Sequence, residues 1–174
     1  EFAVRAVLAW LATADADGAP NVSPKELFAI VDGHVVVANV ASPRSALNLA
    51  VRPEACLSFV DVFAQKGFKV TGTVRMVAPG EADFARWSAP LRAMAGDTFV
   101  IRSVFVLEPK RVEAILAPSY RFVPGTTEAS QSAAAMARYG VVRPVPSGGA
   151  SPLPAAATLL AFAAFAIALL LSGS

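Results

Sequence analysis

The sequence has little cysteine and little histidine, with one of each among its 174 residues. The single cysteine, Cys56, excludes an intramolecular disulfide and fits a reducing compartment. Together with the single histidine, His34, it excludes a zinc site of the usual Cys and His type, so we expect no metal. His34 directly follows the turn pair Asp32-Gly33, a placement that does not favour a Ser-His-Asp triad.

Charge is also scarce. Charged residues make up 16% of the chain and the formal net charge is +2, which is too small a basic excess for a surface that coats nucleic acid. We therefore expect no nucleic-acid partner. The phosphate-binding patterns GxxxxGK[ST] and GxGxxG are both absent. The hydrophobic fraction of 55% argues against a disordered chain.

Much of the apolar excess lies at the C-terminal end. Residues 153–171 contain no charged side chain, and as a helix they would span about 28 Å, close to the roughly 30 Å core of a bilayer. Residues 143–152 are rich in Pro, Gly and Ser and indicate a linker. We expect a domain over residues 1–142, this linker and a transmembrane helix over residues 153–171. Arg138 and Arg143 precede that helix and favour a cytoplasmic domain anchored to the membrane.

The hydrophobic tail could instead be a helix buried in an oligomer or a remnant of a gene fusion.

Upstream of the tail, the pattern is mostly short strands between turn signals. Residues 35–40 are apolar on both faces, which predicts a central buried strand. The sequence predicts an α+β barrel of about six strands near residues 7–13, 21–31, 35–40, 55–60, 67–77 and 99–107, with helices near residues 42–51, 79–96 and 128–139. Pro90 should kink or split the second of these helices.

The sharpest chemical signal is the tetrapeptide Ser42-Pro43-Arg44-Ser45, where a strand is followed by a helix. A helix N-terminus presents unpaired N–H groups and a partial positive charge, which suit a phosphate. The Arg44 guanidinium and the hydroxyls of Ser42 and Ser45 add donors for phosphate oxygens. The alternative is an ordinary Ser-Pro cap beside a surface arginine.

Further polar residues lie near predicted strand ends. Lys25 follows Ser23-Pro24 where a strand is interrupted, and Gln65 with Lys66 precedes the strand over residues 67–77. Asn48 falls four residues after Arg44, on the same face of the helix. Each lysine alone could equally be a solvated surface residue. Together, these groups fit an anionic, planar cofactor bound against a barrel wall.

Four segments carry a resemblance to a known family: LATADADGAPNVSPK, VVVANVASPRSALNL, RPEACLSFVDVF and QKGFKVTGTVRMV. Their order resembles that of the pyridoxamine 5'-phosphate oxidase-like flavin-binding split barrels, closely over residues 6–77 and more loosely to about residue 139. The resemblance implies a six-stranded split β-barrel with flanking helices. It also implies a homodimer with FMN in clefts at the dimer interface.

The same resemblance suggests roles for individual residues. Ser42 and Arg44 match the motif that holds the FMN phosphate, and Asn48 follows in that motif. The remaining matches are to the strand along the isoalloxazine ring, the SPK lysine and the next hairpin: Val37, Ala38, Asn39, Lys25, Gln65 and Lys66. With Ser45, these form the expected cofactor-binding set.

Three functions follow as hypotheses. The first is an FMN-dependent oxidoreductase acting on a small molecule that the sequence does not identify. The second is a non-catalytic flavin-binding or stress-related protein, which would hold FMN without oxidising NAD(P)H. The third is a membrane-tethered structural dimer with an empty barrel. After Tyr139 the sequence lacks the substrate-binding segment of the oxidase that names the family, so vitamin B6 oxidation itself is not expected.

Overall fold

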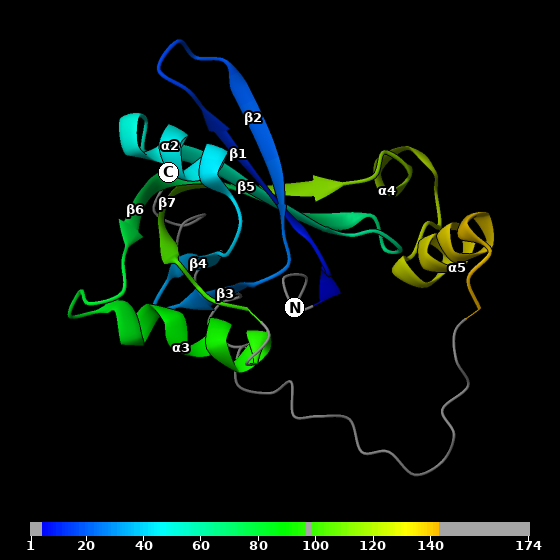
Figure 1. Ribbon diagram of the computed structural model, residues 1–174. Coiled ribbons are helices and arrows are strands. Elements are labelled where there is room, and N and C mark those ends of the chain that lie inside the picture. Colours follow the sequence, from blue (N-terminus) through cyan, green and yellow to red (C-terminus); the bar gives the residue numbers. More distant parts are fainter. Residues whose placement is uncertain (1–4, 97–98, 143–174) are drawn as a thin grey trace.

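The computed structural model describes residues 5–96 and 99–142. They form one curled antiparallel sheet with helices against it (Figure 1). The seven strands in this part of the chain follow the spatial order β2-β1-β5-β6-β7-β4-β3. In chain order the strands are β1 (Ala9–Ala14), β2 (Pro20–Lys25), β3 (Phe28–Val31), β4 (His34–Asn39), β5 (Glu54–Asp61), β6 (Lys66–Val77) and β7 (Ser103–Leu116).

The prediction of six strands was one too few, because residues 21–31 form two strands instead of one. β2 pairs with β1 at one edge of the sheet, whereas β3 pairs with β4 at the opposite edge. Glu26 and Leu27 connect them, and the Leu27 carbonyl accepts a hydrogen bond from the Ala38 N–H at 2.9 Å. The chain therefore passes from one edge of the sheet to the other in two residues. This is possible because the sheet is curled, so that its two edges approach each other.

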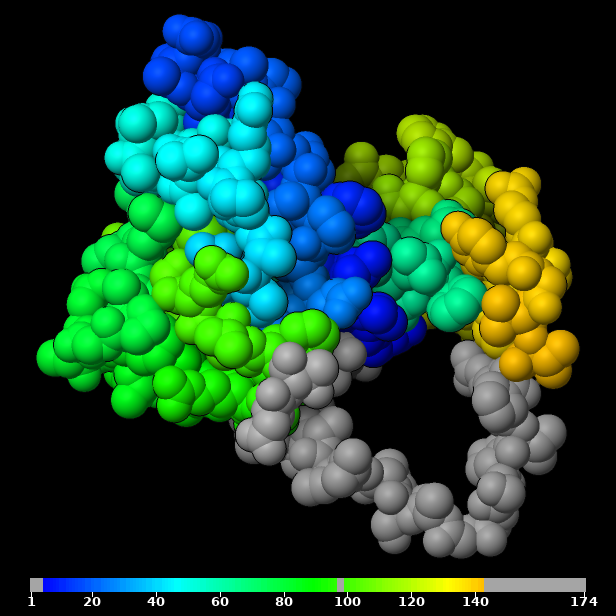
Figure 2. Space-filling view, in the orientation of Figure 1, coloured from blue at the N-terminus to red at the C-terminus, as the bar shows by residue number. Residues whose placement is uncertain are grey.

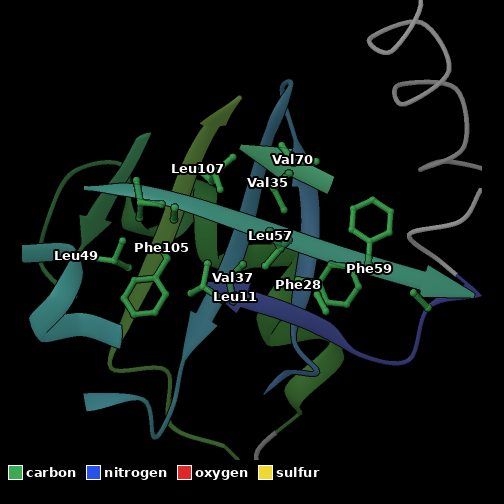
Figure 3. Packing of buried hydrophobic residues seen from close by; sticks show 14 residues of the cluster. Leu11, Phe28, Val35, Val37, Leu49, Leu57, Phe59, Val70, Phe105 and Leu107 are labelled. Carbon is green, nitrogen blue, oxygen red and sulfur yellow. The ribbon is translucent and has the colours of Figure 1, made fainter. Parts of the chain in front are cut away.

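The inner face of the sheet encloses the main hydrophobic core. Alternating residues of the strands point inward, as the two-residue period of a strand dictates, and Leu57 lies in the middle of them with no exposed surface (Figure 3). Leu57 is paired with Leu11 on β1, and the rings of Phe28 and Phe59 stack nearby with centroids 6.0 Å apart. Leu49 of α2 (Pro43–Val51) belongs to the same core.

A second, smaller core lies on the outer face, under α3 (Phe84–Ala95). β4 contributes to both cores, Val35 and Val37 to the inner one and Val36 and Ala38 to the outer one, which confirms the prediction of a strand buried on both faces. The sequence predicted a kink or a split at Pro90; α3 runs through Pro90 without interruption, so the split does not occur. Trp87 and Leu91 on either side of Pro90 are buried against the sheet, and this packing offsets the hydrogen bond that proline cannot donate.

The remaining helices lie at opposite ends of the sheet (Figure 1). α2 packs on β1 and β2, beside the tip of the β1–β2 hairpin. After β7 come α4 (Ser119–Phe122) and α5 (Glu128–Tyr139), which lie next to the turn that joins β5 to β6. The predicted helix over residues 128–139 is confirmed, with Thr127 as its N-cap and Gly140 as its left-handed C-cap.

The predicted linker over residues 143–152 and the predicted transmembrane helix over residues 153–171 lie outside the described residues. Within residues 5–96 and 99–142, none of the helices is long and apolar enough to cross a bilayer.

Candidate functional site

A pocket of about 210 Å³ opens where the two edges of the sheet come together beside the start of α2. Its polar wall includes the side chains of Lys25 and Ser42, and much of the remaining wall is apolar. The residues that line it are Pro24, Lys25, Glu26, Leu27, Ala38, Val40, Ala41, Ser42 and Phe99. A concave site with a mainly apolar wall and a few convergent polar groups is the usual form of a small-molecule site.

Lys25 is the charged group at the centre of this wall. It is 4% exposed, because β2 turns its side chain inward, toward α2. Its Nζ donates to Ser42 Oγ at 2.5 Å and to Ser23 Oγ at 2.7 Å. Burial lowers the pKa of the Lys25 ammonium from its ordinary value. No carboxylate of the described residues forms an ion pair with it, so the buried charge lacks a compensating anion.

Beneath Lys25, a chain of neutral polar side chains fixes the hydroxyls. Ser45, which is 1% exposed, lies with its Oγ 3.0 Å from Ser23 Oγ and accepts from Asn21 Nδ2 at 3.4 Å. Asn48 Nδ2 donates to Thr13 Oγ1 at 3.0 Å, which extends the chain across α2 to β1. Because these groups satisfy one another, the serine hydroxyls stay in place beside Lys25.

The loop from β4 into α2 is fixed by Asn39. Its Oδ1 accepts from the Ser42 N–H at 3.3 Å and its Nδ2 donates to Ser103 Oγ at 3.0 Å. Ser42 is the N-cap residue of α2, yet its side chain forms no cap hydrogen bond. The hydroxyl is instead within hydrogen-bond distance of Lys25. The site thus combines a buried cation, two hydroxyls and the positive end of a helix, all of which favour an anion such as a phosphate.

The structure brings together most of the predicted residues. Lys25, Ala38 and Ser42 line the pocket, while Asn39, Ser45 and Asn48 support it from behind. Val37 points into the inner core instead, is 1% exposed and is not among the residues that line the pocket.

Three predicted residues lie elsewhere in the protomer. The Arg44 side chain is 67% exposed on the outer side of α2, with one guanidinium nitrogen 3.8 Å from an Asp15 carboxylate oxygen. Figure 2 shows α2 (cyan) next to the β1–β2 hairpin (blue). Gln65 and Lys66 lie at the β5–β6 turn, against α5, where Gln65 accepts from Gln131 and Lys66 faces Glu128.

Several residues of the site were missed from the sequence. Ser23 could have been predicted most easily, because it precedes Lys25 by two residues in a strand and therefore lies on the same face of that strand. Asn21 donates to Ser45, and Thr13 accepts from Asn21 and Asn48. The β1–β2 register, which pairs Thr13 with Asn21, brings these two residues together. Leu27 lies in the bend after β2 and Phe99 in the segment before β7, and no local motif marks either residue as part of the pocket.

Comparison with protein families gives one match. Residues 1–117 match the family described as pyridoxamine 5'-phosphate oxidase. No curated protein is significantly similar in sequence to this chain.

Solved structures resemble the fold at low sequence identity. The heme storage protein HutZ from Vibrio cholerae is 23% identical with a TM-score of 0.56, and the match covers 66% of this chain and 89% of that one. An FMN-binding protein from Syntrophomonas wolfei is 13% identical with a TM-score of 0.57, over 67% and 82% of the two chains. HupZ from Group A Streptococcus is 21% identical with a TM-score of 0.51, over 60% and 82%. At these identities the likeness concerns the fold alone.

Proposed function

This chain belongs to the pyridoxamine 5'-phosphate oxidase family, and from that premise we propose that it is an FMN-dependent oxidoreductase acting on a small molecule. The observation that carries the proposal is the buried Lys25 ammonium, which faces two serine hydroxyls and has no carboxylate partner among the described residues. Such a group is stabilised by an incoming anion, and the FMN phosphate supplies one.

The residues present fit the phosphate end of FMN. Lys25 and Ser42 would donate to its oxygens, and the first N–H groups of α2 add a partial positive charge. The pocket volume of about 210 Å³ in one protomer is below the roughly 300–1,000 Å³ typical of small-molecule sites. The ring of the cofactor therefore needs a further wall.

We propose that a second copy of the chain supplies that wall. The outer face of β1 and β2 exposes apolar side chains, with Trp10 48% and Val22 57% exposed. The register places Trp10 directly opposite Pro24, which also lines the pocket. A copy docked on this face would close the pocket and could present its own Gln65 and Lys66, which in the same protomer lie against α5 and do not line the pocket.

Flavin is favoured over heme by the chemistry of the wall. Protein ligands of heme iron include histidine, cysteine, methionine and tyrosine, and none of the described residues that line the pocket is of these types. The single histidine, His34, is at the start of β4, with its ring centroid 5.2 Å from that of Trp87 under α3. One structural relative is named as a heme storage protein, but the described residues that line this pocket include none of these iron-ligand types.

When bound, FMN would accept or donate a hydride. The chain itself would hold the phosphate through Lys25 and Ser42 and would keep water from one side of the site with Leu27 and Phe99. Glu26 is the carboxylate among the lining residues, and its side chain is exposed.

The test is a visible absorbance spectrum of the purified full chain, followed by identification of what heat releases. We expect an oxidised-flavin spectrum and free FMN. Oxidation of NAD(P)H by the loaded protein would support the oxidoreductase. Tight FMN binding without any such turnover would favour the alternative, a flavin-binding or stress-related protein without catalysis. A colourless protein that takes up no added FMN would contradict both.

FMN affinity should depend on pH through Lys25. The Lys25 side chain pairs with the phosphate only in its protonated, ammonium form, and burial lowers the pKa of Lys25 below the ordinary 10.5. The dissociation constant is therefore expected to rise as pH increases through this lowered pKa, before 10.5 is reached. Titrations by flavin fluorescence at neutral to alkaline pH measure the effect, starting above the second phosphate pKa of about 6. The alkaline loss should disappear in Lys25→Met, and its persistence there would assign it to another group.

We also propose that the hydrophobic tail anchors the protein to a membrane. Deleting residues 153–174 should move the chain from the membrane fraction to the soluble fraction, because it removes the uncharged run over residues 153–171. The measurement is fractionation followed by circular dichroism of the truncated chain. Loss of the fold on truncation, or aggregation of the truncated chain, would mean that the tail is part of the core.

A further inference from the structure

The segment after β7 returns to contact the β5–β6 turn. The Gln65 carbonyl accepts from the Ala117 N–H at 3.1 Å, and Tyr120 Oη donates to the Ala64 carbonyl at 2.6 Å. Gln131 Nε2 of α5 donates to Gln65 Oε1 at 2.7 Å. Figure 2 shows α5 in contact with this turn at one end of the molecule. Most of these contacts come from residues beyond the family match, which ends at residue 117.

The turn itself has a defined shape. The Asp61 carboxylate accepts from the Phe63 N–H at 2.9 Å and the Ala64 N–H at 3.0 Å, and it pairs with Arg5 at 2.5 Å. Gln65 adopts a left-handed backbone with φ of 52°, which is unusual for a residue other than glycine. The hydrogen bonds to its carbonyl and its side chain hold it there, so α5 and the segment before it help to set the direction of Gln65 and Lys66.

Glu128 connects α5 to the charge of this turn. Its carboxylate lies 3.5 Å from Lys66 Nζ and 2.5 Å from the Arg5 guanidinium. The hydrogen bond from Arg5, with a smaller effect of Lys66, lowers the pKa of Glu128 from its ordinary value. Lys66 Nζ also lies 4.4 Å from the centre of the Tyr120 ring, which holds the ammonium from the other side. The Lys66 charge is thus oriented and partly neutralised by residues of α4 and α5.

We propose that Glu128 is a positioning residue that tunes the flavin through Lys66. The inference rests on the proposed function, in which the Gln65–Lys66 turn of one copy faces the FMN of the other. A positive charge near the ring stabilises the reduced flavin, which is the more negative form. By neutralising Lys66, Glu128 holds the reduction potential down and weakens FMN binding. α5 would therefore act on the redox chemistry of the flavin through Lys66.

The test is Glu128→Gln in the full chain, loaded with FMN. The amide keeps the size of the side chain and removes the charge opposite Lys66. We expect FMN to bind about threefold to tenfold more tightly, and the reduced form to gain up to about tenfold more than the oxidised form. By linkage, that tenfold difference raises the two-electron potential by about 30 mV. Glu81→Gln is the matched control, since Glu81 is an exposed carboxylate 3.5 Å from Arg75, in the segment before α3.

Lys66→Met separates the route through Lys66 from a structural effect. In the Lys66→Met background, Glu128→Gln should change the potential less than in the wild-type background, because the Lys66 charge that it releases is gone while its other partner, the Arg5 guanidinium, remains. An equal shift in both backgrounds, or none in the wild-type background, would overturn the role of Glu128 while FMN binding stands. If the wild-type chain takes up no FMN at all, the proposed function is wrong and the inference falls with it.

Discussion

Lys25→Met should abolish most of the FMN affinity. The variant removes the charge-assisted hydrogen bonds of one buried ammonium, an interaction of about 1.5–3 kcal/mol, and this corresponds to about a 10- to 150-fold rise in the dissociation constant. Methionine keeps the length and the apolar stem of lysine, so the pocket should keep its shape. Isothermal titration of the full chain with FMN measures the loss.

Two control variants distinguish a loss of FMN binding from a loss of the fold. Lys110→Met, on an exposed position of β7, changes the same residue type away from the pocket and should leave the dissociation constant unchanged. Arg44→Ala should weaken binding less than Lys25→Met, because the Arg44 side chain is 67% exposed and is not among the residues that line the pocket. The unliganded Lys25→Met protein should be at least as stable as the wild type, since it no longer buries an uncompensated cation. Unaltered FMN affinity in Lys25→Met would remove the central assignment.

Leu57→Ala should destabilise the fold by about 2–5 kcal/mol, the range for truncating a large aliphatic side chain in a core. Leu57 has no exposed surface and contacts the middle of the inner core from β5 (Figure 3). The surrounding strands are held by their ladders and cannot collapse fully onto the cavity. Urea unfolding of the FMN-free protein, followed by far-UV circular dichroism, measures the change.

Leu47→Ala is the matched control for this variant. It is the same substitution on α2, where the Leu47 side chain is 68% exposed, and its effect should stay within about 0.5 kcal/mol. Similar losses for the two variants would mean that the face of α2 carrying Leu47 is buried in the protein in solution, against a second copy or another part of the chain.

Much of the fold could be predicted from local patterns. The apolar run over residues 35–40 and the Ser-Pro start of α2 both carry strong local signals, and both elements were predicted within one residue of their bounds. The division of residues 21–31 could not be predicted, because neither Glu26 nor Leu27 is a glycine or proline that would mark the end of a strand. The sheet imposes it, since the two halves pair with different strands. Pro90 misled the prediction for a related reason: tertiary packing of α3 outweighs the local preference of proline.

The site followed the same division between local and nonlocal information. Ser42 and Ser45 could be predicted from the helix start, and Lys25 from its place at a strand interruption. Arg44 was expected to face a phosphate, yet within one protomer its side chain is 67% exposed and lies 3.8 Å from Asp15, although the helical period places it on the same face of α2 as Asn48. The partners of Gln65 and Lys66 on α5 lie far away in the chain, 66 residues for the Gln65–Gln131 pair, and no spacing rule reaches that far.

The strand order has a consequence for how long the protein survives. In the sheet formed by the described residues, β2 and β3 are the two edge strands, and edge strands invite pairing with other chains. A molecule bound between Lys25 of β2 and Ala38 of β4 contacts both halves of the sheet at once and links them to each other. At a concentration about one hundred times its dissociation constant, a ligand adds about 2.7 kcal/mol to the folded state. The supply of cofactor would then affect the lifetime of the polypeptide as well as its chemistry. Molecules without bound flavin would be the first to aggregate or be degraded.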